Sequence, residues 1–203
     1  MFEKSFFRKK CLQERMSLNL SCVTRQISSQ IEFFFKHYLI DSIGFYYPIR
    51  GEIDLREPLL TLKERHFVQQ LALPCIRDGK LKFSVWSKEY SLIKDEAGVP
   101  APFGTKEIHP QCLLIPCVAV DRDGYRLGYG GGWYDRLLQS EEFMLTIGVV
   151  GSQFTLDCLP HESHDRPLDG FVNENGFTWV KPLGEKGLKL ISSDRHRSYK
   201  DLP

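Results

Sequence analysis

The 203-residue sequence has no paired-cysteine pattern, no long apolar run and no excess of either charge. Its six cysteines are scattered without C-x-x-C spacing, which disfavours a disulfide framework or a structural zinc site. No run approaches the ~20 apolar residues that span a bilayer, and the N-terminus lacks a signal-peptide core. The formal net charge of +1 gives no field that would attract nucleic acid or a membrane surface. We therefore expect a cytoplasmic protein without nucleic-acid or membrane partners.

Two common nucleotide-binding signatures are also missing. The P-loop pattern G-x-x-x-x-G-K-[ST] occurs nowhere in the chain. The dinucleotide pattern G-x-G-x-x-G, started at Gly128, would need a glycine where Trp133 stands. No acidic residue follows about twenty positions later to bind a ribose, since that region is 146–151. A nicotinamide oxidoreductase is thus disfavoured and remains an alternative that a dinucleotide titration would settle.

The apolar periodicity predicts one α/β domain. Helical spacing covers 3–17, 28–38, 55–71 and 133–138, and strand-like runs cover 42–48, 71–76, 82–86, 112–120, 145–150 and 177–180. The glycine- and proline-rich stretch 98–104 is expected to be an ordered irregular loop. This alternation favours a three-layer α/β/α domain with a mostly parallel central sheet over residues 1–180. The polar remainder, 181–203, is predicted to be a mobile tail.

A glycine-rich loop is the most informative stretch of the sequence. Residues 126–136 read RLGYGGGWYDR and lie between an apolar run and a predicted helix start. Four glycines in five positions, at 128 and 130–132, remove side chains that would keep an anion away from the backbone N–H groups. The loop therefore predicts a phosphate site, and a purely structural turn is the alternative.

The N-terminal helix offers two cations one turn apart. Lys4 and Arg8 have i, i+4 spacing, so both side chains can reach the same point in space. An anionic ligand and a pair of solvated surface cations both fit this spacing. Further along, residues 160–169 are dense in titratable groups and include His161 and His164, to which we assign only a loop-shaping role.

Taken together, these motifs resemble the 5-formyltetrahydrofolate cyclo-ligase family, also called 5,10-methenyltetrahydrofolate synthetases. The glycine loop matches that family's R-L-G-x-G-x-G-[YW]-Y-D signature, and Lys4 and Arg8 match its K-x-x-x-R helix. Other matches, in the same order along residues 4 to about 175, are Tyr47 with Glu52, Pro74, 99–102, 115–116, and His164-Asp165 through Asp169. Phe7 and Trp133 depart modestly from the usual residues.

The resemblance implies a fold and an activity. The fold would be NagB/RpiA/CoA-transferase-like, in a monomer. The activity (EC 6.3.3.2 type) would be ATP- and Mg²⁺-dependent closure of 5-formyltetrahydrofolate to 5,10-methenyltetrahydrofolate, with release of ADP and phosphate, in one-carbon metabolism. The formyl oxygen would be phosphorylated first, and N10 of the folate would then attack. A non-catalytic folate- or nucleotide-binding regulator on the same fold remains the runner-up.

The resemblance also implies roles for individual residues. Catalytic cations would be Lys4, Arg8 and Arg126. ATP would be bound by Lys4, Arg8, Arg126, Leu127, Gly128, Tyr129, Gly130, Gly131, Gly132, Trp133 and Tyr134. The folate would be bound by Tyr47, Glu52, Tyr129, Gly130, Gly131, Gly132 and Trp133. Mg²⁺ would be held by Asp135 and Asp169, because a hard cation prefers carboxylate oxygens together with phosphate oxygens and water.

Overall fold

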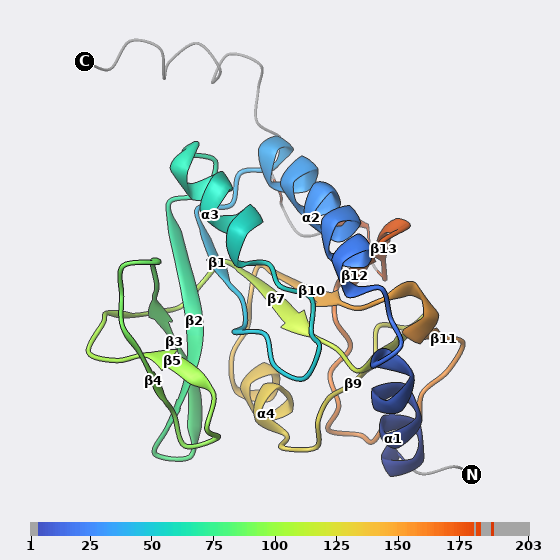
Figure 1. Cartoon of the computed structure of the whole chain (residues 1–203). Coiled ribbons are helices and arrows are strands. Elements are labelled where there is room, and N and C mark those ends of the chain that lie inside the picture. Colours follow the sequence, from blue (N-terminus) through green and yellow to red (C-terminus); the bar gives the residue numbers. More distant parts are fainter. Residues whose placement is uncertain (1–3, 181, 184–187, 189–203) are drawn as a thin grey trace, which may run out of the picture.

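A mostly parallel eight-stranded sheet forms the centre of the protein, as a computed structural model of residues 4–180, 182, 183 and 188 shows (Figure 1). The strand order is β13-β12-β10-β7-β1-β2-β3-β6. The strands are β1 (Ser42–Gly44), β2 (Gln70–Arg77), β3 (Lys80–Val85), β6 (Glu107–Ile108), β7 (Cys112–Pro116), β10 (Leu145–Val149), β12 (Gly170–Asn173) and β13 (Gly176–Trp179). The consecutive strands from β12 to β2 are parallel, and the antiparallel strands lie outside them. The predicted sheet type is confirmed.

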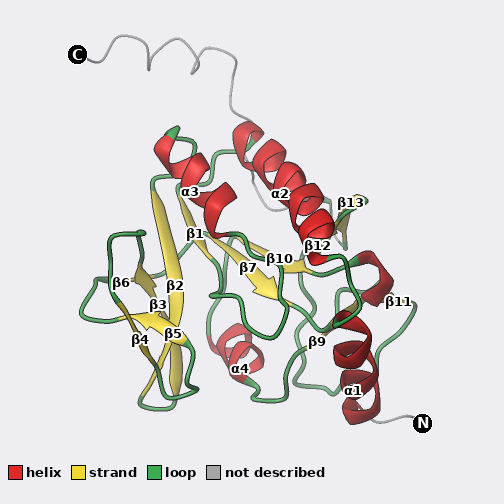
Figure 2. Cartoon of the chain, in the orientation of Figure 1, coloured by secondary structure: helices red, strands yellow, loops and turns green. Residues whose placement is uncertain are grey.

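Helices cover both faces of this sheet (Figure 2). Helices α2 (Leu20–His37) and α3 (Arg56–Glu64) pack on one face, and α1 (Lys4–Arg15) and α4 (Trp133–Ser140) lie on the other. Successive strand residues point to opposite faces. In β7, Leu114 joins the core under α2 and α3, whereas Leu113 and Ile115 join the core on the α1 and α4 side. The three-layer prediction is confirmed.

The strand predicted at 112–120 is two strands in two different sheets. Strand β7 ends at Pro116, and β8 (Ala119–Asp121) pairs with β9 (Arg126–Leu127) and β11 (Thr155–Leu156) in a small second sheet. The change occurs where Cys117 N donates to Val149 O and Val118 N donates to Leu127 O. Because β9 ends at Leu127, this second sheet holds the start of the glycine loop beside the carboxyl end of β7.

The irregular loop predicted at 98–104 is wrong in its central part. Strand β5 (Pro100–Pro102) pairs antiparallel with β4 (Leu92–Lys94), and Ala101 between the prolines is buried. Proline cannot donate to a ladder, so it is confined to edge strands. A two-stranded sheet consists only of edges and accommodates both prolines.

Two predicted helices have different limits in the structure. The helix expected at 28–38 begins at Leu20, where the Asn19 side chain accepts from Cys22 N. The helix expected at 55–71 covers only Arg56–Glu64, because the chain turns through His66 with φ +61° before β2 begins. The strand expected at 42–48 is regular only over Ser42–Gly44.

The limits of the domain remain a prediction. Residues 181, 184–187 and 189–203 lie outside the described part of the chain, so the predicted C-terminal tail falls almost wholly there. Among the helices that the structure describes, none combines the length and apolarity needed to cross a bilayer.

Candidate functional site

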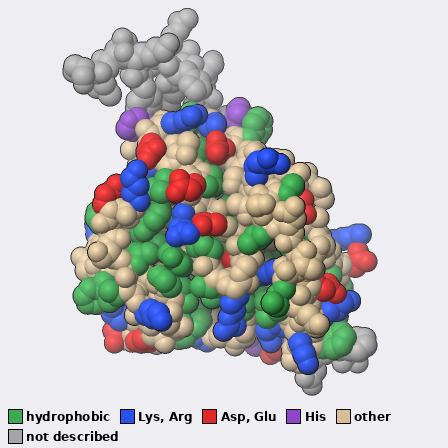
Figure 3. Space-filling model, in the orientation of Figure 1, with side chains coloured by type: hydrophobic (Ala, Val, Ile, Leu, Met, Phe, Trp, Pro, Cys, Tyr) green, Lys and Arg blue, Asp and Glu red, His purple; other side chains and the backbone are tan. Residues whose placement is uncertain are grey.

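One cavity of about 490 Å³ opens at the carboxyl ends of the central parallel strands. Its walls include Tyr46 and Tyr47 after β1, Pro116 at the end of β7, and residues of β2. Helix α1, the loop 126–135 and the loop 160–169 close the other sides. Figure 3 shows hydrophobic side chains gathered in a hollowed part of one face, with charged side chains around them. Ligands of parallel α/β sheets bind at this end of the strands.

The glycine loop forms one wall of the cavity and depends on its glycines. Gly130 and Gly132 have φ of +98° and +65°, a region that favours glycine. A Cβ on Gly131 would lie only 2.8 Å from the Trp133 ring. Helix α4 begins immediately afterwards, and its N-cap Gly132 provides no side-chain hydrogen bond. The N–H groups of the first turn of α4 therefore have no cap from Gly132, which suits an anion.

The three predicted cations all line the cavity, and each already has a partner. Arg8 Nε donates to the Gly128 carbonyl at 2.7 Å, which attaches α1 to the glycine loop. Arg126 Nη2 pairs with Asp135 at 2.7 Å, and the Arg126 side chain is only 4% exposed. Arg126 Nε is buried without a hydrogen-bond partner in the described residues. The Arg126 guanidinium therefore has a donor that no described residue uses.

Lys4 pairs with Asp165, a residue without a predicted role. Lys4 Nζ lies 2.5 Å from Asp165 Oδ2, and the same oxygen accepts from Glu162 N at 2.7 Å. Burial raises the pKa of the Asp165 carboxyl, but these two hydrogen bonds outweigh it and leave the pKa below its usual value. Loop 160–169 is thus tied to the first turn of α1 at the edge of the cavity.

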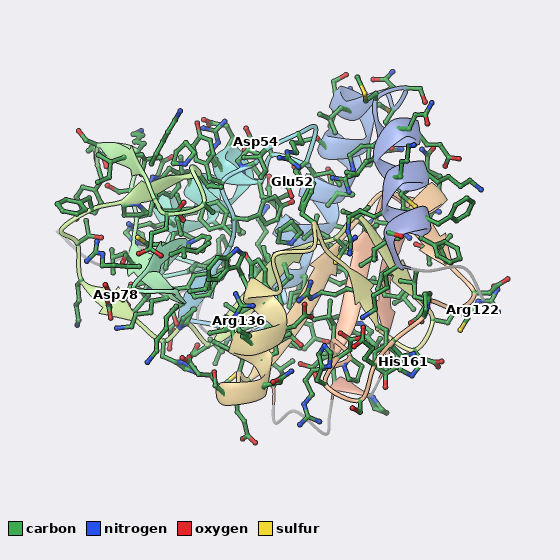
Figure 4. All side chains as sticks on the ribbon, turned by 90° about the horizontal axis from the view of Figure 1, so that it is seen from below. Glu52, Asp54, Asp78, Arg122, Arg136 and His161 are labelled. Carbon is green, nitrogen blue, oxygen red and sulfur yellow. The ribbon has the colours of Figure 1, made fainter. Side chains whose placement is uncertain are left out.

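Glu52 lies at the end of a tight turn. Arg50 and Gly51 both have positive φ, +49° and +73°, and Glu52 N donates to Ile49 O. The carboxylate caps the same turn, because Ile49 N donates to Glu52 Oε2 at 2.9 Å. The other oxygen, Oε1, is buried and has no hydrogen-bond partner among the described residues. Figure 4 shows Glu52 in the interior, whereas Asp78, Arg122 and His161 lie toward the periphery.

Burial dominates the chemistry of the Glu52 carboxyl. It raises the pKa from 4.5 to about 7, although the Ile49 N–H, Arg15, Tyr129 and Arg50 all act to lower it. One carboxyl oxygen of Glu52 remains unused, and in its ionised form the group can accept N–H donors from a ligand.

The predicted aromatic side chains also line the cavity. Cations lie over them: Arg56 is 4.8 Å from the Tyr47 ring centre, and Arg136 is 4.5 Å from that of Trp133. The Tyr134 hydroxyl is buried without a hydrogen-bond partner in the described chain, and burial raises its pKa well above the usual value. These faces, together with Tyr129, can enclose a flat heterocycle.

Asp135 and Asp169, the two predicted metal ligands, lie in different surroundings. Asp135 lines the cavity beside Arg126. Asp169 is not among the described residues that line it: its Oδ2 accepts from both N and Oγ1 of Thr146, at 2.8 and 2.9 Å. Asp169 precedes β12 and Thr146 follows the first residue of β10, so this contact joins the amino ends of two strands. The described residues contain no cluster of three or more metal-ligating side chains.

The sequence motifs assign no role to Arg15, Arg50 or Asp165. Arg15 is buried, and its guanidinium donates to the Tyr129 hydroxyl at 2.8 Å and to the Cys117 carbonyl at 2.6 Å. The sequence does contain a signal for Arg15, because Arg8 and Arg15 are seven residues apart and therefore share one helix face. Arg50 and Asp165 depend on a left-handed turn and a long-range contact, which spacing does not show.

The fold and the cavity define an α/β enzyme domain with a glycine-rich loop at the carboxyl end of a parallel sheet. Comparison with known proteins gives the family. The 5-formyltetrahydrofolate cyclo-ligase family matches residues 3–174, and the chain belongs to it.

Individual relatives agree with this assignment. The chain is 28% identical over 177 residues to the 5-formyltetrahydrofolate cyclo-ligase of Mycoplasma pneumoniae, covering 85% of this chain and 99% of that protein. It is 41% identical over 137 residues to that of Haemophilus influenzae, covering 63% and 72%. Among solved structures, Aquifex aeolicus 5,10-methenyltetrahydrofolate synthetase superposes with a TM-score of 0.74 at 29% identity, covering 88% of this chain and 93% of that one.

Proposed function

We propose that this enzyme uses ATP to convert 5-formyltetrahydrofolate to 5,10-methenyltetrahydrofolate, with release of ADP and phosphate. The observation that carries the proposal is that three residues lining one cavity each hold an unsatisfied polar atom: Glu52 Oε1, Arg126 Nε and Tyr134 Oη. Each is buried and lacks a hydrogen-bond partner in the described residues. A buried polar atom without a partner is costly, so a ligand that satisfies all three gains affinity and specificity.

The reaction runs in two balanced steps. The formyl oxygen attacks the γ-phosphorus of ATP, the bond to the ADP oxygen breaks, and an imidoyl phosphate forms. N10 then attacks the formyl carbon, phosphate departs with the former formyl oxygen, and N10 loses its proton to solvent. Phosphoryl transfer of this kind depends mainly on positioning and on neutralising charge.

The glycine-loop side of the cavity is the proposed nucleotide site. Backbone N–H groups between Gly128 and the start of α4 would bind the phosphates, and Lys4, Arg8 and Arg126 would neutralise them. Leu127, Tyr129, Trp133 and Tyr134 would complete its walls. Lys4 would exchange Asp165 for phosphate oxygens, because its only described ion-pair partners are Asp165 and Glu162.

The other side of the cavity is the proposed folate site. The Glu52 carboxylate would accept N–H groups at the edge of the pterin ring, and Tyr47, Tyr129 and Trp133 would pack on its faces. Residues 130–132 separate the two ligands, so the formyl oxygen would face the γ-phosphate across the glycines.

Of the two predicted Mg²⁺ ligands, one lies in a position suited to bind the ion. Mg²⁺ is usually held by one or two carboxylates together with phosphate oxygens and water. Asp135 lines the cavity and is suited to that role, and we propose Asp135 alone as the direct protein ligand. Bound there, the ion would neutralise charge on the ATP phosphates. Asp169 would act only through the strands that it joins.

We also propose that a monomer in the cytoplasm is the active form. All six cysteines, which lie in the described residues, are unbridged, as is usual in a reducing compartment.

Purified protein with ATP, Mg²⁺ and 5-formyltetrahydrofolate tests the activity directly. We expect the absorbance of the methenyl product to appear, with one ADP released per product, and we expect omission of any component to abolish it. Folded protein that binds both ligands without turnover would instead favour the non-catalytic regulator.

A further inference from the structure

Arg15 is a buried cation that touches the cavity only through other residues. It lies in the last turn of α1, is 9% exposed, and is not among the described residues lining the cavity. Its two terminal nitrogens have different acceptors, the Tyr129 hydroxyl at 2.8 Å and the Cys117 carbonyl at 2.6 Å. A guanidinium held at both ends has a fixed position, so its charge acts at a defined point.

The Tyr129 hydroxyl connects Arg15 to Glu52. Its oxygen accepts from Arg15 and therefore keeps its own proton to donate. Tyr129 and Glu52 line the same cavity, Arg15 and Glu52 line a second, smaller one, and both Arg15 and Tyr129 act to lower the pKa of the Glu52 carboxyl. The titratable and charged groups that face Glu52 come from several elements: Arg15, Arg50, Tyr46, Tyr129, Tyr134 and Cys117. The two arginines among them carry a positive charge at neutral pH. Arg15 donates to the Tyr129 hydroxyl, whereas Arg50 lies 5.5 Å from the centre of the Tyr129 ring.

We propose that Arg15 is a positioning residue that acts through Tyr129 to keep Glu52 ionised and its free oxygen directed at the pterin. This inference rests on the proposed function for the identity of the ligand. Its structural basis is independent of that function, since the buried Arg15, the Tyr129 hydroxyl that it holds and the buried Glu52 carboxyl are features of the protein alone. Without Arg15, Glu52 would be a buried carboxyl with weaker stabilisation of its charge.

Helix α1 connects Arg15 with the cations of the proposed nucleotide site. Lys4, Arg8 and Arg15 follow at i, i+4 and i+11 and lie along one face of the helix. Arg8 holds the Gly128 carbonyl while Arg15 holds the next side chain in the loop, that of Tyr129. One helix thus fixes both the proposed phosphate cations and the residue that controls the folate carboxylate.

The primary experiment titrates Glu52 in the ligand-free protein by carbon-13 NMR of labelled glutamate carboxyls, assigned with Glu52→Gln. The wild-type resonance should titrate near pH 7. We expect Arg15→Met and Tyr129→Phe to move the midpoint upward by about one pH unit or more. Arg15→Lys, which keeps the charge, should restore much of the difference. Arg25→Met, on the exposed face of α2, is the matched control and should leave the midpoint unchanged.

Folate binding supplies the functional readout. Fluorescence quenching with 5-formyltetrahydrofolate in the absence of ATP should show about tenfold weaker affinity for Arg15→Met at pH 7 and recovery near pH 9, where Glu52 ionises again. A structural defect alone would weaken binding at every pH. Tyr129→Phe keeps the ring and its packing, so this variant still tests the inference if Arg15→Met folds poorly.

The two possible failures are distinguishable. A Glu52 midpoint that stays at the wild-type value in both Arg15→Met and Tyr129→Phe overturns the inference, whatever the protein binds. If the variants shift the Glu52 midpoint as expected but the protein does not bind 5-formyltetrahydrofolate at any pH, the proposed function is overturned instead.

Discussion

Glu52 is a buried residue whose charge makes stability depend on pH. Its folded pKa of about 7 lies above the ordinary 4.5, so the folded protein holds a proton that the unfolded chain has already lost. The stability from this residue is therefore full below pH 4.5 and is lost as pH rises through 7. About 2.5 pH units at 1.36 kcal/mol each gives a loss of about 3 kcal/mol.

Glu52→Gln should remove this dependence, because the amide is neutral throughout. Urea unfolding from pH 4 to 8 should show the wild type losing about 3 kcal/mol relative to the variant. The control is Glu142→Gln, an exposed glutamate that should follow the wild-type curve. Parallel curves for wild type and Glu52→Gln would show that Glu52 titrates normally.

Asp135 and Asp169 should respond differently to loss of charge. Asp135→Asn should raise the Mg²⁺ concentration for half-maximal activity by about tenfold or more, because it removes the proposed direct ligand. Asp169→Asn should leave that concentration unchanged and cost about 1–3 kcal/mol of stability, since Thr146 loses a charged acceptor. Magnesium titration and urea unfolding measure the two effects. The reverse pattern would return Asp169 to the metal site.

At the level of single residues, the sequence was informative wherever a motif is contiguous. Lys4, Arg8, Glu52 and the glycine loop line one cavity, as the family pattern implied. Asp169 could not be placed, because its position depends on which end of the sheet the loop before β12 reaches. The unpaired oxygen of Glu52 depends on a left-handed turn at Arg50, which no spacing predicts.

Among the elements, the glycine loop needs both its backbone conformation and its open space. Gly130→Ala should cost about 1–2 kcal/mol for a residue at φ +98°, and its Cβ would lie 3.5 Å from Arg8 Cζ. We expect the KM for ATP to rise by about tenfold, because the methyl group occupies the proposed phosphate path. The matched control is Gly79→Ala, at φ +67° with no atom within 4 Å.

Gly79→Ala should lose similar stability and keep the wild-type KM for ATP. Unfolding and steady-state kinetics on both variants separate strain from function. If the two variants show equal ATP kinetics, the loop is only a structural turn.

The apolar pattern of the sequence does not predict which strands pair with each other. Residues 112–120 form one continuous apolar run, yet the chain changes sheets after Pro116 because Val118 pairs with Leu127 instead of continuing the β7 ladder. An apolar run reports burial and does not report which partner strand buries it. Prolines at 100 and 102 likewise argued against a strand, although an isolated two-stranded sheet accepts them.

At the scale of the whole molecule, separate parts of the chain line one cavity, and each part belongs to a different proposed ligand site. Helix α1 and the glycine loop would provide the nucleotide side, and the turn after β1 would provide the folate side. Each ligand binds only the folded protein and should therefore stabilise it by mass action, by about 2.7 kcal/mol at one hundred times its Kd. For a chain of this size, that predicts a rise in Tm of about 5–10 °C.

Variants on the two sides should respond to different ligands. Glu52→Gln should lose the Tm rise with 5-formyltetrahydrofolate and keep the rise with a non-hydrolysable ATP analogue and Mg²⁺. Arg8→Ala should do the opposite, because its guanidinium lies against the glycine loop. Differential scanning fluorimetry with each ligand alone measures both. If either variant loses both responses, the two ligands do not bind as separate halves of the cavity, and the assignment of α1 to the nucleotide and Glu52 to the folate fails.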